Sequence, residues 1–287
     1  LRRILAEELV GEHLFGGRMR GYPYTLLVIF FGWVVYMSDM PTAAGTTPED
    51  KQGAIRLHVV FNNVSGRSDL QTGWGFACWV DGLSKTLLFD TGGDGDILLS
   101  NMSRLGFTAD AVEAIVLSHI HGDHTGGLAG FLDRHSDVTV YVPESFPVSF
   151  QRQVESFGAS IETVSGPRRL FGDVHSTGQM GTVIKEQALI LDTRKGLVVV
   201  TGCAHPNVAD MAERASEYLD KEVYLLMGGF HLGGAREDEI QEIIQRLRAI
   251  GVKKVSPSHC TGGHAIQMFR KEWGDDFLEG GLGAVIE

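Results

Sequence analysis

The chain has 287 residues, of which 43% are hydrophobic and 21% are charged, and its formal net charge at pH 7 is −11. This length suits one large domain or two small ones. The acidic balance argues against a nucleic-acid backbone as the main partner, and we expect no nucleic-acid partner but a small-molecule substrate, which can itself be anionic.

Residues 1–44 are predicted to be separate from the folded domain. From Met19, a short basic end, an apolar run over residues 22–37 and small residues up to Ala44 form the pattern of a secretory signal peptide behind an upstream extension. The run is short for a membrane span, which needs ~20 residues, and a retained membrane anchor is the alternative. Residues 45–54 are a predicted linker. We therefore expect export (periplasmic or extracellular) or membrane anchoring, or a cytoplasmic protein if the extension is not part of it.

In the first half of the domain, the hydrophobic pattern predicts strands alternating with helices. A hairpin is expected around Asp81–Gly82, and a buried-type strand leads into residue 118. The predicted strands are 55–61, 74–80, 86–89, 114–117, 138–142 and 161–164, and the predicted helices are 96–105, 128–135 and 147–157.

The second half follows the same plan. Helix 237–250 is clearly amphipathic, with isoleucine and leucine side chains at helical spacing on one face. The predicted strands are 188–191, 197–200, 223–227, 252–255 and an edge strand within 280–286, with helices 206–219, 237–250 and 264–273. Alternating strands and helices with polar sites at strand ends indicate an α/β fold.

Residues 118–127 (SHIHGDHTGG) hold four strong metal ligands in a strand-to-helix loop: His119, His121, Asp123 and His124. Two residues apart in extended backbone, the first two histidines point the same way and can share one ion. The glycine that follows lets the chain turn, and the next two ligands can face a second ion. Imidazole and carboxylate suit zinc, with iron or manganese as alternatives. An ordinary His-rich polar loop is the competing interpretation, and the spacing argues against it.

This HxHxDH pattern after a strand resembles the metallo-β-lactamase superfamily. Four further motifs occur in the order of one branch, the metal-dependent hydrolases of β-lactamase superfamily II, which includes the archaeal dihydropterin-type synthase of methanopterin biosynthesis. They are residues 89–92 (FDTG), 202–205 (GCAH), 228–232 (GGFHL) and 258–262 (SHCTG). The resemblance covers residues 55–287 as a single domain. It implies a four-layer αββα sandwich with the metals at one edge, between two sheets.

The resemblance also implies two ligand sets. His205 is the third ligand of the first ion, with His119 and His121, which leaves one open position, as in catalytic zinc sites. His259 is the third ligand of the second ion, with Asp123 and His124. Many members carry a bridging aspartate after the strand equivalent to 223–227, where this chain has only GGFH. His231 therefore either completes the second ion's shell or contacts the substrate.

Other residues are predicted to support the site. Asp90 resembles the superfamily's acid that orients a ligating histidine, acting outside the ligand shell. Thr261 and Gly262 open a helix beside His259 and are expected to bind an anionic substrate group, unless Thr261 simply caps the helix. Asn62, Asn63 and Trp74 lie in stretches similar to family segments at the pocket mouth.

The remaining cysteines and histidines carry weaker signals. Cys203 and Cys260 each adjoin a candidate ligand, and the fold could bring them together, although small buried residues are the simpler interpretation. The other histidines match no motif and are expected to be structural or solvated: His13, His58, His135, His175 and His264.

The expected activity is metal-assisted hydrolysis of an ester, phosphoester, lactone or amide bond. Two divalent ions, zinc by preference, would generate hydroxide near neutral pH. Asp123 would hold one ion and accept a hydrogen bond from that hydroxide, and His231 is the second catalytic candidate. The alternatives are a transferase of the dihydropterin-synthase type and a metal-containing ligand-binding protein without turnover.

Overall fold

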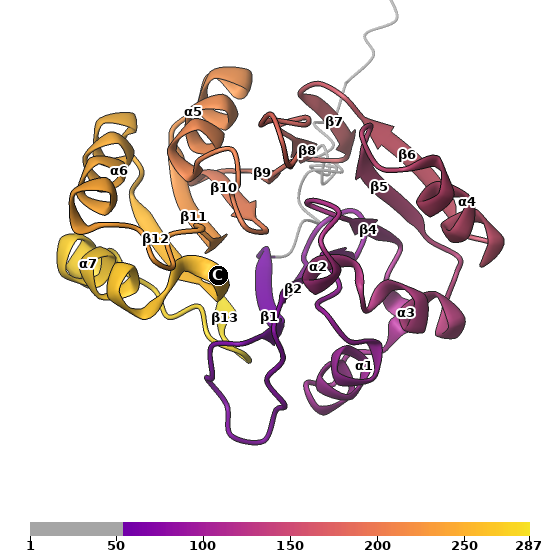
Figure 1. Cartoon of the computed structure of the whole chain (residues 1–287). Helices are drawn as coiled ribbons and strands as arrows, with labels where there is room; N and C mark the ends of the chain where they lie inside the picture. The colour runs from indigo at the N-terminus through magenta and orange to yellow at the C-terminus, as the bar shows by residue number, and fades with distance from the viewer. Residues whose placement is uncertain (1–53) are drawn as a thin grey trace, which may run out of the picture. The chain divides into compact units, whose positions relative to one another are not determined.

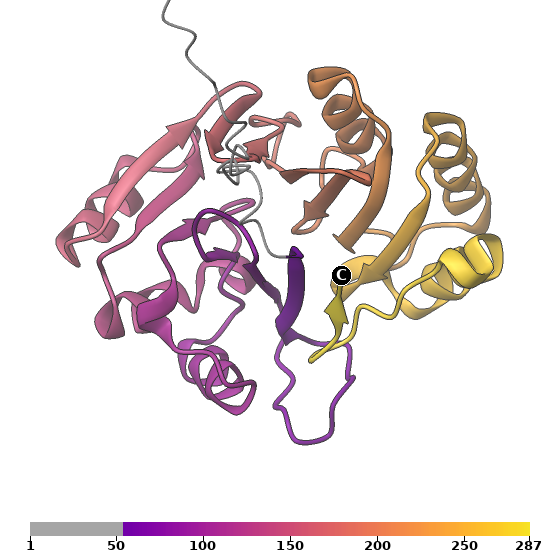
Figure 2. The same ribbon diagram turned by 180° about the vertical axis from the view of Figure 1, so that it is seen from behind.

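The computed structural model describes residues 54–287, which belong to one unit (Figures 1 and 2). The predicted signal peptide or anchor and nearly all of the predicted linker lie outside these residues. Within residues 54–287, no helix combines the length and the apolar character needed to cross a membrane.

Two β-sheets lie at the centre, and helices cover their outer faces (Figure 1). The seven-stranded sheet has the order β13 (Val285–Ile286), β1 (Arg56–Asn62), β2 (Phe76–Asp81), β3 (Leu87–Phe89), β4 (Ala114–Val116), β5 (Thr139–Pro143), β6 (Ser160–Val164). The six-stranded sheet has the order β12 (Lys254–Ser258), β11 (Val223–Gly229), β10 (Gly196–Thr201), β9 (Leu189–Thr193), β8 (Val174–Ser176), β7 (Arg168–Phe171).

Each sheet has its own helices. The seven-stranded sheet carries α1 (Gly95–Arg104), α3 (Leu128–Arg134) and α4 (Val148–Ser156), and the six-stranded sheet carries α5 (Val208–Leu219), α6 (Glu237–Ile250) and α7 (Gly263–Trp273). A one-turn helix, α2 (Gly122–Thr125), follows the first histidines of the loop, and short 3-10 turns include η3 (His259–Thr261).

Three buried clusters separate the four layers. Along β10, Val198 and Val200 point into the cluster between the sheets, whereas Leu197 and Val199 point into the cluster beneath α5–α7. Successive strand residues face opposite sides of a sheet, and here both sides are covered. This is the predicted αββα sandwich.

Burial of both strand faces sets the cost of core substitutions. Leu226 of β11 is fully buried beneath the helices of the second sheet. We expect Leu226→Ala to lower the free energy of unfolding by about 2–5 kcal/mol, through lost burial and the cavity left behind. Val183, 90% exposed, is the control, and Val183→Ala should stay within about 0.5 kcal/mol. Equal urea midpoints for the two variants would contradict this account of the core.

Most predicted elements are present, with shifts of one to three residues at their ends. Helix 237–250 is α6, and the expected edge strand is β13, which pairs with β1. Two strands, β7 and β8, and the short α2 were not predicted. Strand β7 is polar and only half-buried, so its pattern lacks the apolar alternation that marks a strand.

Parallel pairing brings the predicted site residues to one edge of the molecule. Strand β3 runs parallel to β4, and β10, β11 and β12 are mutually parallel neighbours. The carboxyl ends of parallel strands meet at the same edge of a sheet. The loops after β3, β4, β10, β11 and β12 therefore bring Asp90 and the candidate metal ligands toward one another.

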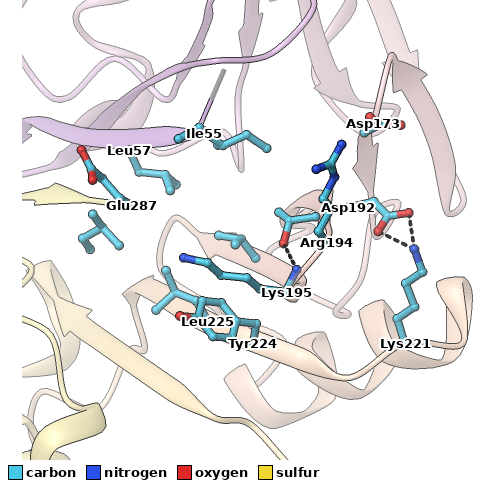
Figure 3. Close-up of a pocket in the computed structure, with 14 residues that line it drawn as sticks. Ile55, Leu57, Asp173, Asp192, Arg194, Lys195, Lys221, Tyr224, Leu225 and Glu287 are labelled. Atoms are coloured by element: carbon cyan, nitrogen blue, oxygen red, sulfur yellow. Dashed lines mark hydrogen bonds and ion pairs between the residues drawn. The ribbon is translucent and has the colours of Figure 1, made fainter. Parts of the chain in front are cut away.

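A cavity of about 830 Å³ lies at the opposite ends of these strands (Figure 3). It is lined by the start of β1, the turn between β9 and β10, and the start of β11, with Lys195 and Tyr224 among its residues. Lys221 is paired there with Asp192, at 2.7 Å. None of the predicted site residues lines it, so the cavity is separate from the histidine loops.

Candidate metal centre

Candidate ligands of the described residues gather in three groups, and within each group the ligand atoms lie within 4.8 Å of one another. The first contains His119, His121 and His205, and the second contains Asp123, His124, His259 and Cys203. The third, described below, takes Cys203 and His205 from these two and adds His231. Apart from Cys203, the first two groups are the division predicted from the sequence. These two groups adjoin, because the His119 and His124 rings are 4.3 Å apart between centroids.

The first group is formed by three imidazole rings. His119 Nε2 lies 3.2 Å from His121 Nδ1. The His205 ring lies 4.6 Å from the His119 ring and 4.8 Å from the His121 ring, between centroids. Burial lowers the pKa of His119 to about 2. The ring is therefore neutral near pH 7, the form in which histidine binds a metal.

The second group is centred on a carboxylate. Asp123 Oδ2 lies 3.5 Å from His124 Nε2 and 3.4 Å from His259 Nε2. Burial would raise the pKa of Asp123, but its hydrogen bonds to His124 and His259 hold that pKa well below its usual range. Burial would likewise lower the pKa of His124, but Asp90 and Asp123 raise it to about 10. A metal ion would have to displace this proton.

Asp90 supports one histidine of each group. Its Oδ2 accepts a hydrogen bond from His124 Nδ1 at 2.7 Å and another from the Ser118 hydroxyl at 2.7 Å. The Ser118 oxygen lies 2.8 Å from His119 Nδ1 and, since its own proton goes to Asp90, accepts from that ring. The contact predicted for Asp90 is present, and through Ser118 it extends to both groups. Asp90 has φ 55°, a strained conformation of the kind that gathers at functional sites.

The predicted mouth residues divide into two kinds. Asn63 Oδ1 accepts from His259 Nδ1 at 2.6 Å, which fixes that ring, and the exposed Trp74 ring lies 5.1 Å from the His259 ring between centroids. Asn62 is fully buried and its amide donates to Ser258 Oγ and to the Gly280 carbonyl. Asn62 therefore holds the segments at Ser258 and Gly280 in place and does not line the pocket mouth.

Glu186 is a residue of the centre that the sequence analysis missed. It is fully buried, and its Oε1 accepts the backbone N–H of Cys203 and of Ala204, both at 2.8 Å. Its Oε2 accepts the N–H of His205 at 2.9 Å and the Nδ1 proton of the same ring at 2.8 Å. Burial would raise the pKa of Glu186, but the hydrogen bonds to His205 lower it to about 2. Glu186 thus shapes the loop after β10 and orients His205.

His231 is not brought to the second group. Its exposed side chain lies against His205, with 4.4 Å between ring centroids, and it forms a group with Cys203 and His205. The neighbouring Phe230 is buried against Phe269 of α7, and His231 has φ 52°, in the left-handed region. His231 therefore lies beside His205 of the first group, and its role as a ligand of the second ion stays a prediction. Its hydrogen bond to Cys260 raises the pKa of His231.

At the start of α7, Thr261 was expected either to bind an anionic substrate group or to cap the helix. The Thr261 hydroxyl is buried, donates to the Ser258 carbonyl at 2.6 Å and accepts the Phe230 N–H at 3.0 Å. Gly262, not Thr261, is the N-cap of α7. The capping role for Thr261 is therefore wrong, and any anion at this helix start would meet backbone N–H groups rather than the Thr261 hydroxyl.

The donor set fits divalent transition-metal ions. Imidazole, carboxylate and thiol are the ligand types that zinc prefers. Three candidate ligand histidines make a hydrogen bond through Nδ1: His124 to Asp90, His259 to Asn63 and His205 to Glu186. Hydrogen bonds of this kind fix the orientation of metal-binding rings.

Comparison with known proteins decides the family. The profile of the Metallo-beta-lactamase superfamily matches residues 76–209. The chain is 31% identical over 252 residues to 7,8-dihydropterin-6-methyl-4-(beta-D-ribofuranosyl)-aminobenzene-5'-phosphate synthase of Methanocaldococcus jannaschii, with 72% of this chain and 86% of the relative covered. The chain belongs to the metallo-beta-lactamase superfamily.

Solved structures of this superfamily share the fold. A metal-dependent hydrolase of the beta-lactamase superfamily superposes with a TM-score of 0.69 at 25% identity, covering 81% of this chain and 98% of that one. The metallo-beta-lactamase fold protein YhfI from Bacillus subtilis superposes with a TM-score of 0.60 at 17% identity, covering 82% of this chain and 100% of that one. The second likeness concerns the fold alone.

The hydrogen bonds that link Asp90 and Ser118 to His124 and His119, here called the Asp90 network, give a prediction for this metallo-beta-lactamase centre. Asp90→Asn should weaken metal binding by both groups by ~10–100-fold, the usual cost of losing a support outside the ligand shell. Ser118→Ala leaves the His124 contact intact and should weaken only the first group. Titration of metal-free protein with zinc in a competing chelator measures both affinities. If Ser118→Ala weakened metal binding at both groups as much as Asp90→Asn does, the hydrogen bonds assigned to Asp90 and Ser118 would be contradicted.

Proposed function

We propose that this chain is a metal-dependent hydrolase that holds two divalent ions, zinc by preference. His119, His121 and His205 would hold one, and Asp123, His124 and His259 the other. The observation that supports this most is the pair of donor groups at the shared edge of the two sheets, each backed by buried hydrogen-bond acceptors. The similarity to a metal-dependent hydrolase at 25% identity agrees with it.

The ions would lower the pKa of water and polarise the bond under attack. The residues of the chain provide the rest. Asp123 has a side chain that is 20% exposed, and it accepts a hydrogen bond from the attacking water. His231 lies exposed beside His205, and its raised pKa favours a positive ring that binds an anionic group of the substrate.

The surroundings favour a small substrate with a ring and an anionic group. Trp74 is 62% exposed beside His259 and offers a face on which a planar ring can stack. The backbone N–H groups at the start of α7 can bind a phosphate or carboxylate. Phosphoesters and lactones are therefore the first substrates to test among the ester, phosphoester, lactone and amide classes.

Group transfer is the second candidate. It is favoured by the 31% identity to the Methanocaldococcus jannaschii synthase. In that case the same donor groups would serve displacement on a dihydropterin substrate by an aromatic amine instead of by water.

One experiment separates the two. The protein, stripped by chelator and reloaded with zinc, manganese or iron(II), is incubated with aryl phosphodiesters, lactones and a dihydropterin diphosphate, with and without an aromatic amine. Metal-dependent products in the absence of amine support hydrolysis. Product formed only with the amine supports transfer and overturns the hydrolase proposal, and turnover that survives chelation overturns both.

A further inference from the structure

Cys203 adds a fourth atom to the second donor group. Its Sγ lies 3.3 Å from His124 Nε2 and 3.4 Å from His259 Nε2. Asp123 Oδ2 lies 3.5 Å and 3.4 Å from the same two nitrogens. The sulfur and the carboxylate oxygen therefore each contact both imidazole nitrogens.

These separations match the size of a zinc shell. Bond lengths of about 2.0–2.2 Å to nitrogen or oxygen and 2.3 Å to sulfur place the corners of a tetrahedron roughly 3.3–3.6 Å apart. Of the six separations among the four donor atoms, the four between an imidazole nitrogen and either the sulfur or the carboxylate oxygen run from 3.3 to 3.5 Å. All six lie within 4.8 Å, so the four atoms are close enough to bind one ion.

We propose that Cys203 is the fourth protein ligand of the ion held by Asp123, His124 and His259. This inference rests on the proposed function, because it requires that the second group binds a metal. In this assignment, the Cys203 thiolate in the loop after β10 takes the place of the aspartate that many superfamily members carry after the strand equivalent to β11.

The end of β11 has no room for that carboxylate. A Cβ at Gly228 would lie 2.0 Å from the Thr201 carbonyl oxygen. A Cβ at Gly229 would lie 2.3 Å from the Gly202 carbonyl oxygen and 2.7 Å from Cys260 Sγ. Any side chain at either position would collide with the backbone at the end of β10 or just after it, so neither position can supply a carboxylate.

The loop after β10 is built to present Cys203. Glu186 fixes the backbone N–H groups of Cys203 and Ala204, and Ala204 has φ 61°. A Cβ at Gly202 would lie 2.1 Å from Ser118 Oγ, so only glycine lets the loop approach the Asp90 network so closely. The result is that Cys203 joins the second group while His205, two residues later, joins the first.

The assignment makes the two sites chemically different. With four protein ligands, the second site is closed, as structural zinc sites are. The first site keeps three histidines and one free position, as catalytic zinc sites do. Substrate should then bind at the first site, on the side of His231.

Cys260 provides the matched control. Its sulfur lies 3.7 Å from the Cys203 carbonyl oxygen, and it belongs to none of the ligand groups found among residues 54–287. Both cysteines are free. Cys203→Ser and Cys260→Ser therefore make the same chemical change at neighbouring positions, only one of which should alter a metal ion's shell.

The test uses the full chain reconstituted with Co²⁺. The native protein and Cys260→Ser should show a sulfur-to-cobalt charge-transfer absorption in the near ultraviolet, and Cys203→Ser should lose it. X-ray absorption of the zinc form should show sulfur at about 2.3 Å in the same two proteins only. Cys203→Ser should also bind the second ion at least ~10-fold more weakly.

The outcomes are distinguishable. Bound cobalt without the charge-transfer band in the native protein would overturn the Cys203 assignment and leave the proposed function standing. Loss of the band in Cys260→Ser, but not in Cys203→Ser, would overturn it in favour of Cys260. Failure of the native protein to bind cobalt at all would overturn the proposed function, and this inference with it. A native spectrum without the band overturns the assignment even if a variant does not fold.

Discussion

Replacing His121 with alanine is expected to lower turnover by at least ~100-fold and leave the protein folded. Loss of a support outside the ligand shell already costs ~10–100-fold, and loss of a ligand should cost more. His121 is only half-buried, and its ring contacts His119 and His205 rather than the apolar core. Its removal therefore disrupts the first group without opening a cavity in the core.

The measurement is kcat/KM with the best substrate from the screen, together with a urea unfolding curve. His264→Ala is the matched control, because His264 is exposed at the start of α7 and belongs to neither ligand group. It should keep nearly native activity. Full activity of His121→Ala in metal-free buffer would rule out a mechanism that depends on the first group.

Glu186→Gln should lower both the stability of the fold and the metal affinity, although Glu186 lies outside the ligand groups. The Glu186 carboxylate accepts three backbone N–H groups and the Nδ1 proton of His205, all within a fully buried site. Glutamine has one acceptor oxygen, and its NH₂ group would face donors. A buried donor without a partner costs about 1–3 kcal/mol, and loss of a buried charged partner about 3–5 kcal/mol.

We therefore expect Glu186→Gln to lower the free energy of unfolding by about 3 kcal/mol and the zinc affinity of the first group by ~10–100-fold. Urea denaturation and zinc titration of the metal-free protein measure the two effects. Glu144→Gln, at an exposed position, should change neither. Native stability in Glu186→Gln would show that the carboxylate does not hold the loop after β10.

The fold and the two ligand groups could be predicted because their signals are local. His119 and His121 are two residues apart after an apolar strand, and the one-turn helix α2, which begins at Gly122, carries Asp123 and His124. Parallel strands then bring the other histidine loops to the same edge. These features need only periodicity, spacing and the rule that site loops follow strand ends.

The rest depended on tertiary contacts that no local pattern reveals. Glu186 reaches His205 across 19 residues, and Cys203 reaches His124 across 79. A carboxylate in a loop before an apolar strand resembles an ordinary surface residue until the fold buries it. The contact between the His231 and His205 rings is likewise a tertiary contact that sequence spacing does not reveal.

The most direct test of the account is the metal content per chain, measured by plasma mass spectrometry on zinc-loaded protein after removal of free metal. The account predicts two ions in the native protein and in His264→Ala, and about one in either His121→Ala or His259→Ala. Both single variants should thus retain the ion of the intact group. If the native protein bound one ion and neither variant bound any, the two groups would not be separate sites. If the native protein bound no ion, the metal centre itself would be contradicted.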